Sequence, residues 1–129
     1  MDIKTITIFN RSQGSGADSY LRTVLSGCHV FYQTDNRSAN SNSAVVRVME
    51  KSMDKPFAHP QLWKTLTHEQ RLSCWTAQDG DIIVIGDYSK EIQRPSEPRD
   101  EGFETISVKG YTDNRRGIAD LRHIKVIGA

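Results

Sequence analysis

Histidine and cysteine side chains are the natural candidates for chemistry, because they bind metals and act as bases or nucleophiles. The chain carries six of them, at positions Cys28, His29, His59, His68, Cys74 and His123. No two have the Cys-x-x-Cys or His-x-x-x-His spacing that sets ligands side by side on one metal ion. We therefore expect no metal site and no cofactor. We expect both cysteines to be buried free thiols of a protein kept in a reducing cytosol.

A glycine-containing segment, Gln13-Gly14-Ser15-Gly16-Ala17-Asp18, follows the first strand-like stretch. Phosphate-binding loops need a third glycine at a set offset or a Gly-Lys-Ser/Thr, with the N-terminus of a helix behind them. This segment has neither feature, and the residues after it favour a strand. We interpret it as a connecting loop and not as a nucleotide site.

Ser52 and Lys90 are the most suggestive pair for nucleophilic catalysis. Residues 52–56 resemble the Ser-Met nucleophile segment of signal peptidases and LexA-type repressors, and residues 79–84 resemble the Gly-Asp strand that follows it. In that interpretation Ser52 is the nucleophile and a desolvated Lys90 is the base. The gap to Gly80 is far longer than in those families, and Lys90 lies among charged residues, where burial would not lower its pKa. We therefore expect a protein that is not an enzyme, with a Ser-Lys peptidase as the least favoured alternative.

Most of the chain has the residue pattern of short β-strands, with β-branched and aromatic residues between turn signals. Alternation is clear at Ile6 and Ile8, and the continuous apolar run Ile82–Ile85 is typical of a strand buried on both faces. Gly27 marks a bulge or bend in one long strand, or a break into two. The expected strands are Ile3–Phe9, Tyr20–Gln33, Ala44–Met49, Leu72–Ala77, Asp81–Gly86, Phe103–Thr112 and His123–Ile127, with a shorter one at Tyr88–Ile92.

The remaining residues favour loops and one short helix. Polar stretches at about 10–19, 34–43 and 87–102 are expected to be exposed loops. Pro60–Arg71 has the features of one short helix, or of a helical turn or two. Asp81 follows a tight-turn signal, in which its side chain can accept from backbone amides. About seven short strands predict a single mainly β domain over residues 1–129, folded as a small barrel or sandwich with long polar loops.

Composition excludes several classes of protein. The chain has 129 residues, of which 36% are hydrophobic and 26% charged, enough for one modest core. The net charge of +1 has no basic excess of the kind that holds nucleic acid through bulk electrostatics. No apolar run approaches the length of a membrane span, and the N-terminus has no apolar signal core, so a soluble cytoplasmic product is expected.

Three segments carry a resemblance to a known group of proteins. They are Tyr20–Phe31, Trp75–Gly86, and Thr112–Gly117 followed by His123–Gly128. Together they resemble an uncharacterised prophage family of Gram-positive bacteria encoded among head and head–tail joining genes. The Gly80–Gly86 strand pair is also similar to those of phage head-closure (stopper) and head–tail joining barrels.

The resemblance implies a structural part of a virion, at the neck between head and tail, assembled in the host cytoplasm. Such subunits form a homo-oligomeric ring below the portal and adaptor, close the DNA channel and present a platform to the tail. The implied partners are other copies of the chain, portal or adaptor proteins, tail proteins and DNA in the channel, without a membrane. A tail-associated barrel adaptor or terminator protein is the alternative.

Six residues are candidates for partner contacts. The loop at 34–43 could face the channel or a neighbouring ring, and an arginine pair could meet the partner ring or DNA phosphates, although both also fit solvated connections. One tryptophan fits either the core or an exposed interface anchor. The candidates are Asp35, Asn36, Arg37, Trp63, Arg115 and Arg116.

Overall fold

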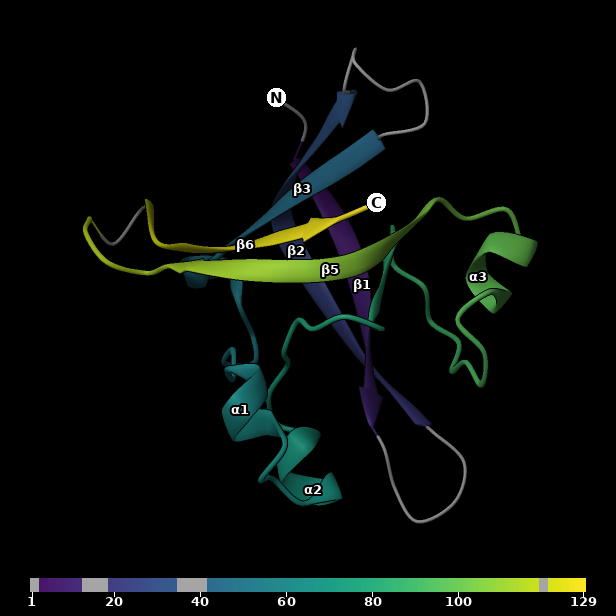
Figure 1. The fold of residues 1–129 in the computed structure, drawn as a ribbon, viewed down its shortest axis with the longest axis horizontal. Coiled ribbons are helices and arrows are strands. Elements are labelled where there is room, and N and C mark those ends of the chain that lie inside the picture. Colours follow the sequence, from purple (N-terminus) through teal and green to yellow (C-terminus); the bar gives the residue numbers. More distant parts are fainter. Residues whose placement is uncertain (1–2, 13–18, 35–41, 119–120) are drawn as a thin grey trace.

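Six antiparallel strands form a closed barrel in the computed structural model, which describes residues 3–12, 19–34, 42–118 and 121–129. The order around the barrel is β1-β2-β3-β6-β5-β4 (Figure 1). The predicted small β-barrel is therefore confirmed, and the sandwich alternative is excluded. The strands are β1 Ile3–Ser12, β2 Ser19–Thr34, β3 Asn42–Met49, β4 Ile82–Ile85, β5 Thr105–Asn114 and β6 His123–Gly128.

The barrel interior is filled by alternate residues of all six strands. Ile6 and Ile8 point into it, as their alternation predicts, and Trp75 and Phe57 enter from outside the strands. Phe9, on the opposite face of β1, packs with Tyr88 and Ile92 in a second cluster outside the wall. β1 is thus buried on both faces, because the segment after β4 folds back over it.

Gly27 forms a bulge inside one continuous strand. The pairing of β1 with β2 changes register between Lys4 and Ile6, which face Cys28 and Leu25. Gly27 has a φ of 67°, a conformation that favours glycine, and a Cβ there would lie 2.9 Å from the Ser52 hydroxyl oxygen. Of the two alternatives for Gly27, the bulge is the one found.

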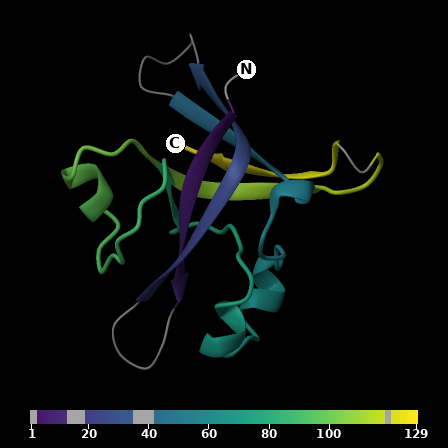
Figure 2. The same ribbon diagram turned by 180° about the vertical axis from the view of Figure 1, so that it is seen from behind.

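β4 is the short strand that closes the barrel. All four of its residues pair with Ile6–Phe9 of β1 on one side, and Ile82–Val84 pair with Thr105–Ser107 of β5 on the other. β5 is longer than β4, so the second half of β5 pairs only with β6. The resulting β5–β6 hairpin projects beyond the barrel wall, and Figures 1 and 2 show it at one end of the molecule, with the short helix α3 (Glu97–Asp100) at the other.

The helices are all short. They are the 3-10 turn η1 Glu50–Ser52 and the α-helices α1 Pro60–Trp63, α2 His68–Arg71 and α3 Glu97–Asp100. Of the alternatives for Pro60–Arg71, separate helical turns are found, because Thr67 starts a second helix with its own capping box to Gln70. No described helix is long and apolar enough to cross a membrane.

Two predicted strands are absent from the described residues. Leu72–Ala77 is irregular and contributes only an isolated bridge between Phe57 and Trp75. Tyr88–Ile92 is irregular as well, and its apolar side chains are buried without strand pairing. Both segments have the apolar composition of a strand because they bury side chains such as Trp75 and Tyr88 without strand pairing.

Two of the three predicted loops are shorter or less exposed than expected. β1 runs on to Ser12 and β2 starts at Ser19, so the loop at 10–19 is reduced to residues 13–18, outside the described part of the chain. The stretch 87–102 contains α3 and buries Tyr88, Ile92 and Pro98. Most of the stretch 34–43, namely residues 35–41, also lies outside the described residues.

Candidate functional site

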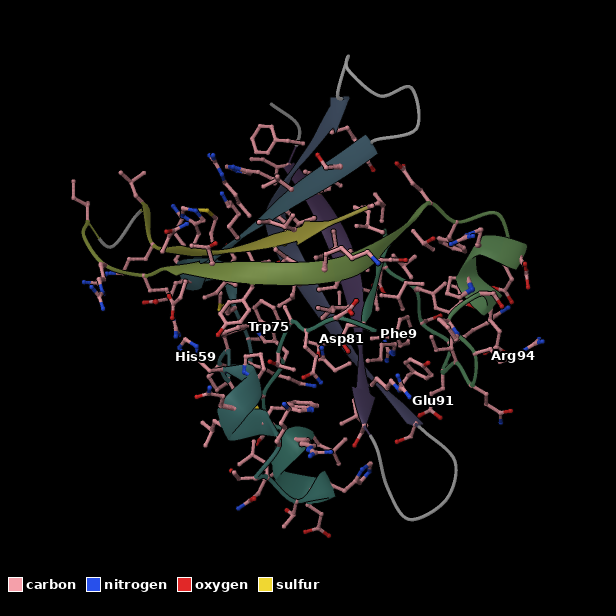
Figure 3. The ribbon with its side chains drawn as sticks, viewed as in Figure 1. Phe9, His59, Trp75, Asp81, Glu91 and Arg94 are labelled. Atoms are coloured by element: carbon pink, nitrogen blue, oxygen red, sulfur yellow. The ribbon has the colours of Figure 1, made fainter. Side chains whose placement is uncertain are left out.

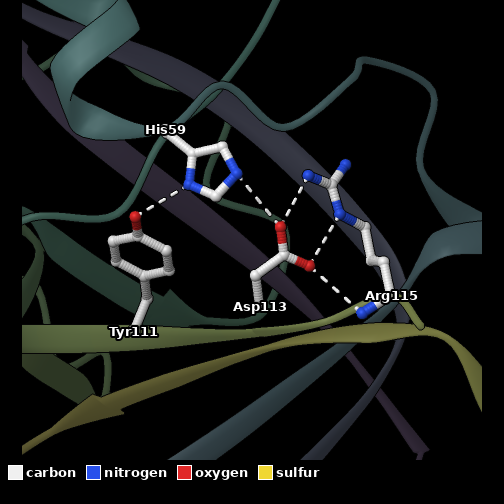
Figure 4. A network of polar contacts seen from close by, with 4 residues as sticks. All are labelled: His59, Tyr111, Asp113 and Arg115. Atoms are coloured by element: carbon white, nitrogen blue, oxygen red, sulfur yellow. Dashed lines mark hydrogen bonds and ion pairs between the residues drawn. The ribbon is translucent and has the colours of Figure 1, made fainter.

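A polar network lies where the β5–β6 hairpin leaves the barrel (Figures 3 and 4). Side chains two residues apart on a strand share a face. Tyr111 and Asp113 on β5, and Arg115 just after it, therefore point to the same side. His59, the residue before α1, meets them from the segment that connects β3 to α1.

His59 uses both ring nitrogens. Its Nδ1 lies 2.8 Å from the Tyr111 hydroxyl oxygen, and its Nε2 lies 3.1 Å from Asp113 Oδ2. The ionised Asp113 carboxylate only accepts, so in the neutral ring Nε2 donates to Asp113 and Nδ1 accepts from the Tyr111 hydroxyl. The imidazole thus links the 57–60 segment to the hairpin.

Arg115 holds Asp113 from the other side. Arg115 Nε donates to Oδ1 at 2.9 Å, Nη2 donates to Oδ2 at 2.8 Å, and the Arg115 backbone N–H donates to Oδ1 at 3.1 Å. This bidentate geometry makes a stronger arginine–carboxylate pair than a single hydrogen bond does. The Arg115 guanidinium holds the pKa of Asp113 below its usual value, and Asp113 raises the pKa of Arg115.

An aromatic floor connects this network to the barrel core. The ring of Phe57 lies 4.8 Å from that of Trp75, 5.2 Å from Tyr111 and 5.5 Å from His59, between centroids. The guanidinium carbon of Arg115 lies 5.6 Å from the centroid of the Phe57 ring. Phe57 and Trp75 are both buried. The base of the projecting hairpin is therefore fixed to the core by packing as well as by polar contacts.

The network borders an open hollow of about 530 Å³ lined by Glu50, His59, Asp113, Arg115 and Arg116. In nucleophilic catalysis a hydroxyl is hydrogen-bonded to an imidazole base, which is in turn oriented by a carboxylate. Tyr111, His59 and Asp113 are connected in this order. Here the carboxylate is already shared with a guanidinium, and His59 is about half exposed. We interpret the arrangement as a clamp that orients the hairpin.

The described residues of the hairpin tip, 115–118 and 121–122, include exposed apolar side chains. Ile118 is 71% exposed and Leu121 is 65% exposed. The tip is tied to the barrel at its base, since Glu50 N–H donates to the Arg122 carbonyl at 3.0 Å and Arg122 Nε donates to the Gly117 carbonyl at 3.1 Å. Exposed apolar side chains mark a contact surface where they gather into one patch, and these two are the apolar residues that the described tip offers for such a contact.

The predicted partner residues fall into three groups. Arg115 lies in the clamp, whereas the neighbouring Arg116 is exposed and has no ion-pair partner among the described residues. Trp63 is 1% exposed and packs with Ala58 and Cys74, so it is a core residue and its ring is not open to a partner. Asp35, Asn36 and Arg37 lie outside the described residues.

Ser52 and Lys90 are not brought together. Ser52 ends η1, which is bonded through Glu50 to Arg122 at the base of the hairpin tip. Lys90 Nζ pairs with Glu101 Oε1 at 3.0 Å, beside α3 at the opposite end of the molecule (Figure 1). The described structure therefore gives Ser52 no base and gives Lys90 no apolar surroundings, as the peptidase alternative would require.

The titratable residues of the core serve the fold. Cys28 and Cys74 are free and buried, as expected, and burial raises the pKa of the Cys28 thiol to about 12. Within the ranges that the structure describes, no three histidine, cysteine or acidic side chains are grouped so that they could hold a metal ion. The sequence identifies His59 only as one of several scattered histidines and does not single out Tyr111 or Asp113. The Tyr-x-Asp-x-Arg alternation at 111–115 was their only signal, because His59 joins them through the fold.

Comparison with known proteins finds a family but no characterised relative. The whole chain, residues 1–129, matches the sequence model of a protein family described as a family of unknown function, DUF6751. No curated protein and no solved structure matches the chain.

Proposed function

The chain belongs to the DUF6751 family, and we propose that it is a structural assembly subunit, a ring-forming head-closure or head–tail connector protein at the neck of a phage or phage-derived particle. In that role it joins the portal or adaptor to the tail and acts through contacts, without catalysis. Its partners are other copies of itself, portal or adaptor proteins and tail proteins.

The observation that carries the assembly role is the projecting hairpin. A closed barrel has no free sheet edge around its wall, so it does not associate by adding strands there. This barrel instead extends β5–β6 beyond β4 and places Ile118 and Leu121 in solvent at the tip. Further exposed apolar residues lie at Ile3 and Tyr32, near the end of the β2–β3 hairpin. Such residues are stabilised when a neighbouring surface covers them.

The neck position is supported by resemblance. The three segments that resemble prophage head and head–tail joining proteins fall on β2, on Trp75 to the end of β4, and on the β5–β6 hairpin. These are the long bulged strand, the closing strand and the projecting hairpin. The likeness therefore lies in the elements that give the barrel its shape.

A gene deletion in the strain that encodes the chain tests this function. After induction of the particle, we expect electron microscopy to show heads and tails that are separate, with infectious particles restored by a plasmid copy. Joined particles in normal number from the deletion strain would contradict the proposal. Joined but empty particles would also contradict it, because they would place the requirement in packaging.

The clamp offers one second candidate, a nucleophilic role for Tyr111 with His59 as its base. It is favoured by the 2.8 Å contact between His59 Nδ1 and the Tyr111 hydroxyl oxygen. Incubation of the purified protein with a fluorophosphonate probe tests it. Labelling of Tyr111 that disappears in His59→Ala would support catalysis, whereas an unlabelled wild-type protein supports the clamp.

A further inference from the structure

A second hollow, separate from the one beside the clamp, lies where α1 and α2 meet the end of β1 (Figures 1 and 2). It has a volume of about 170 Å³ and opens to solvent. None of its described lining residues belongs to the clamp, so a ligand held here would not depend on the β5–β6 hairpin. The lining residues are Arg11, Trp63, Lys64, Arg71, Gln78 and Asp79.

The lining is mainly cationic. Among the described residues it has three basic side chains and one acidic side chain, that of Asp79. Asp79 is 79% exposed, and its Oδ1 lies 4.0 Å from the Nζ of Lys109, which does not line the hollow. Because water screens an exposed carboxylate and this one also faces another lysine, Asp79 offsets little of the positive charge in the hollow.

Arg71 is held in place by neutral oxygen atoms. Its Nε donates to the Trp63 carbonyl at 3.0 Å, its Nη1 to Ser12 Oγ at 2.8 Å and its Nη2 to the Lys64 carbonyl at 3.4 Å. A guanidinium has five N–H donors, so two of them have no partner in the described part of the chain. No described carboxylate forms an ion pair with Arg71 either. Its position is therefore fixed while its charge is left uncompensated.

Lys64 supplies a second cation at the end of α1. Its backbone N–H donates to the Pro60 carbonyl at 3.1 Å, and its carbonyl accepts from Arg71, so the main chain of Lys64 is fixed beside that guanidinium. Its side chain is exposed and has no hydrogen bond or ion pair with a described residue. An anion bound between Lys64 and Arg71 would relieve the repulsion between the two positive charges.

We propose that this hollow binds a phosphate group with two negative charges, either inorganic phosphate or the phosphate of a small phosphomonoester. The planar guanidinium of Arg71 can bond two phosphate oxygens, and Lys64 acts as a point charge. The side-chain amide of Gln78, which also lines the hollow, can donate a further hydrogen bond. This binding site goes beyond the proposed function and does not depend on it.

The size and charge of the hollow favour this ligand over other anions. At roughly 30 Å³ for one water molecule, the hollow is large enough for a phosphate group, and an ester group would extend into solvent through the open side. A phosphate monoester carries about two negative charges at pH 7, which match Lys64 and Arg71. A carboxylate or a DNA phosphodiester carries one charge and would leave one of the two cations unpaired.

Titration of the isotope-labelled chain with inorganic phosphate, followed by NMR at constant ionic strength in sodium chloride, tests this site. Trp63 lines the hollow, whereas Trp75 lies in the barrel core. We expect the indole N–H signal of Trp63 to shift and saturate at millimolar phosphate while that of Trp75 stays in place. Acetate, with one charge, should bind at least about tenfold more weakly because it forms fewer charge-assisted hydrogen bonds.

Two variants of the lining residues sharpen the test. Lys64→Ala removes an exposed side chain with no described partner, so it should fold and should weaken phosphate binding at least about tenfold. Lys51→Ala is the matched control, because Lys51 is also exposed but lies on η1, away from the hollow, and phosphate affinity should not change. Arg71→Lys keeps the charge, loses the planar fork and should also bind phosphate more weakly. Circular dichroism reports whether each variant is folded, and Lys64→Ala decides the test if Arg71→Lys is not.

Glycerol 3-phosphate distinguishes the two sources of the phosphate group. Tighter binding than inorganic phosphate would identify a phosphomonoester as the ligand, and equal or weaker binding would identify free phosphate. The site would be overturned by a Trp63 signal that does not shift, or that shifts without saturating. Acetate that binds as tightly as phosphate would overturn it as well, and so would a folded Lys64→Ala that binds phosphate as the wild type does.

Discussion

Asp81 is expected to make the barrel less stable as the pH rises from about 4 to 7. Its side chain is 2% exposed, at the start of the closing strand. Oδ1 accepts from the Arg11 backbone N–H at 2.9 Å, and Oδ2 accepts from Asn10 Nδ2 at 2.8 Å and from the Gln78 backbone N–H at 3.0 Å. Burial outweighs these donors and raises the pKa of Asp81 from 3.8 to about 6.

The sign follows from proton binding. Between pH 3.8 and about 6 the folded chain still holds the Asp81 proton that the unfolded chain has lost. The folded state therefore binds more protons, and the free energy of unfolding falls as the pH rises through this window. At about 1.4 kcal/mol per pKa unit, the raised pKa corresponds to a loss of about 3 kcal/mol between pH 4 and 7.

Urea unfolding of the wild type and of Asp81→Asn, at half-unit steps from pH 4 to pH 7.5, measures this loss. Asn does not ionise, so the difference in unfolding free energy between the two proteins should change by about 3 kcal/mol across the window. Asp79→Asn is the control, because that neighbouring side chain is 79% exposed. The lowered pKa values of Asp113 and Glu101 act in both proteins and cancel in the difference. Parallel pH profiles for wild type and Asp81→Asn would refute the reasoning.

Three further outcomes are expected. Gly128→Ala should destabilise the barrel by about 3 kcal/mol or prevent folding, because a Cβ would lie 2.3 Å from the Ser107 carbonyl oxygen, whereas Gly110→Ala meets nothing within 4 Å. Equal melting temperatures for the two variants would contradict this. Cys28 should react with a thiol reagent at pH 8 only after unfolding, and rapid labelling of the native protein would disprove its burial. His59→Ala should speed amide exchange in the second half of β5 while lowering stability by only about 0.5–1 kcal/mol, and unchanged exchange would rule out the clamp.

The strands were the most predictable part of the fold. Alternation at Ile6 and Ile8 and the apolar run of β4 are local patterns, so they were visible without the fold. Gly27 was correctly identified as a break in regular pairing, although sequence did not distinguish a bulge from two strands. Leu72–Ala77 and Tyr88–Ile92 were misassigned, because apolar side chains that pack over the outside of a barrel have the same composition as those in its wall.

The candidate site was less predictable. Arg115 and Arg116 were identified as an adjacent pair, but the role of each depends on neighbours distant in sequence. His59 reaches Asp113 across 54 positions, and no spacing rule connects two such residues. Trp63 fitted both the core and an interface from sequence. Its burial depends on Ala58 and Cys74, which lie on either side of α1 and α2 in the sequence, and composition alone does not bring them together.

A concentration series of the purified chain by light scattering tests the assembly role most directly. The account predicts a mass of 14.6 kDa at low concentration and a single defined multiple of it at high concentration, as a ring of one size forms. A mass that stays at one chain up to the solubility limit would contradict it.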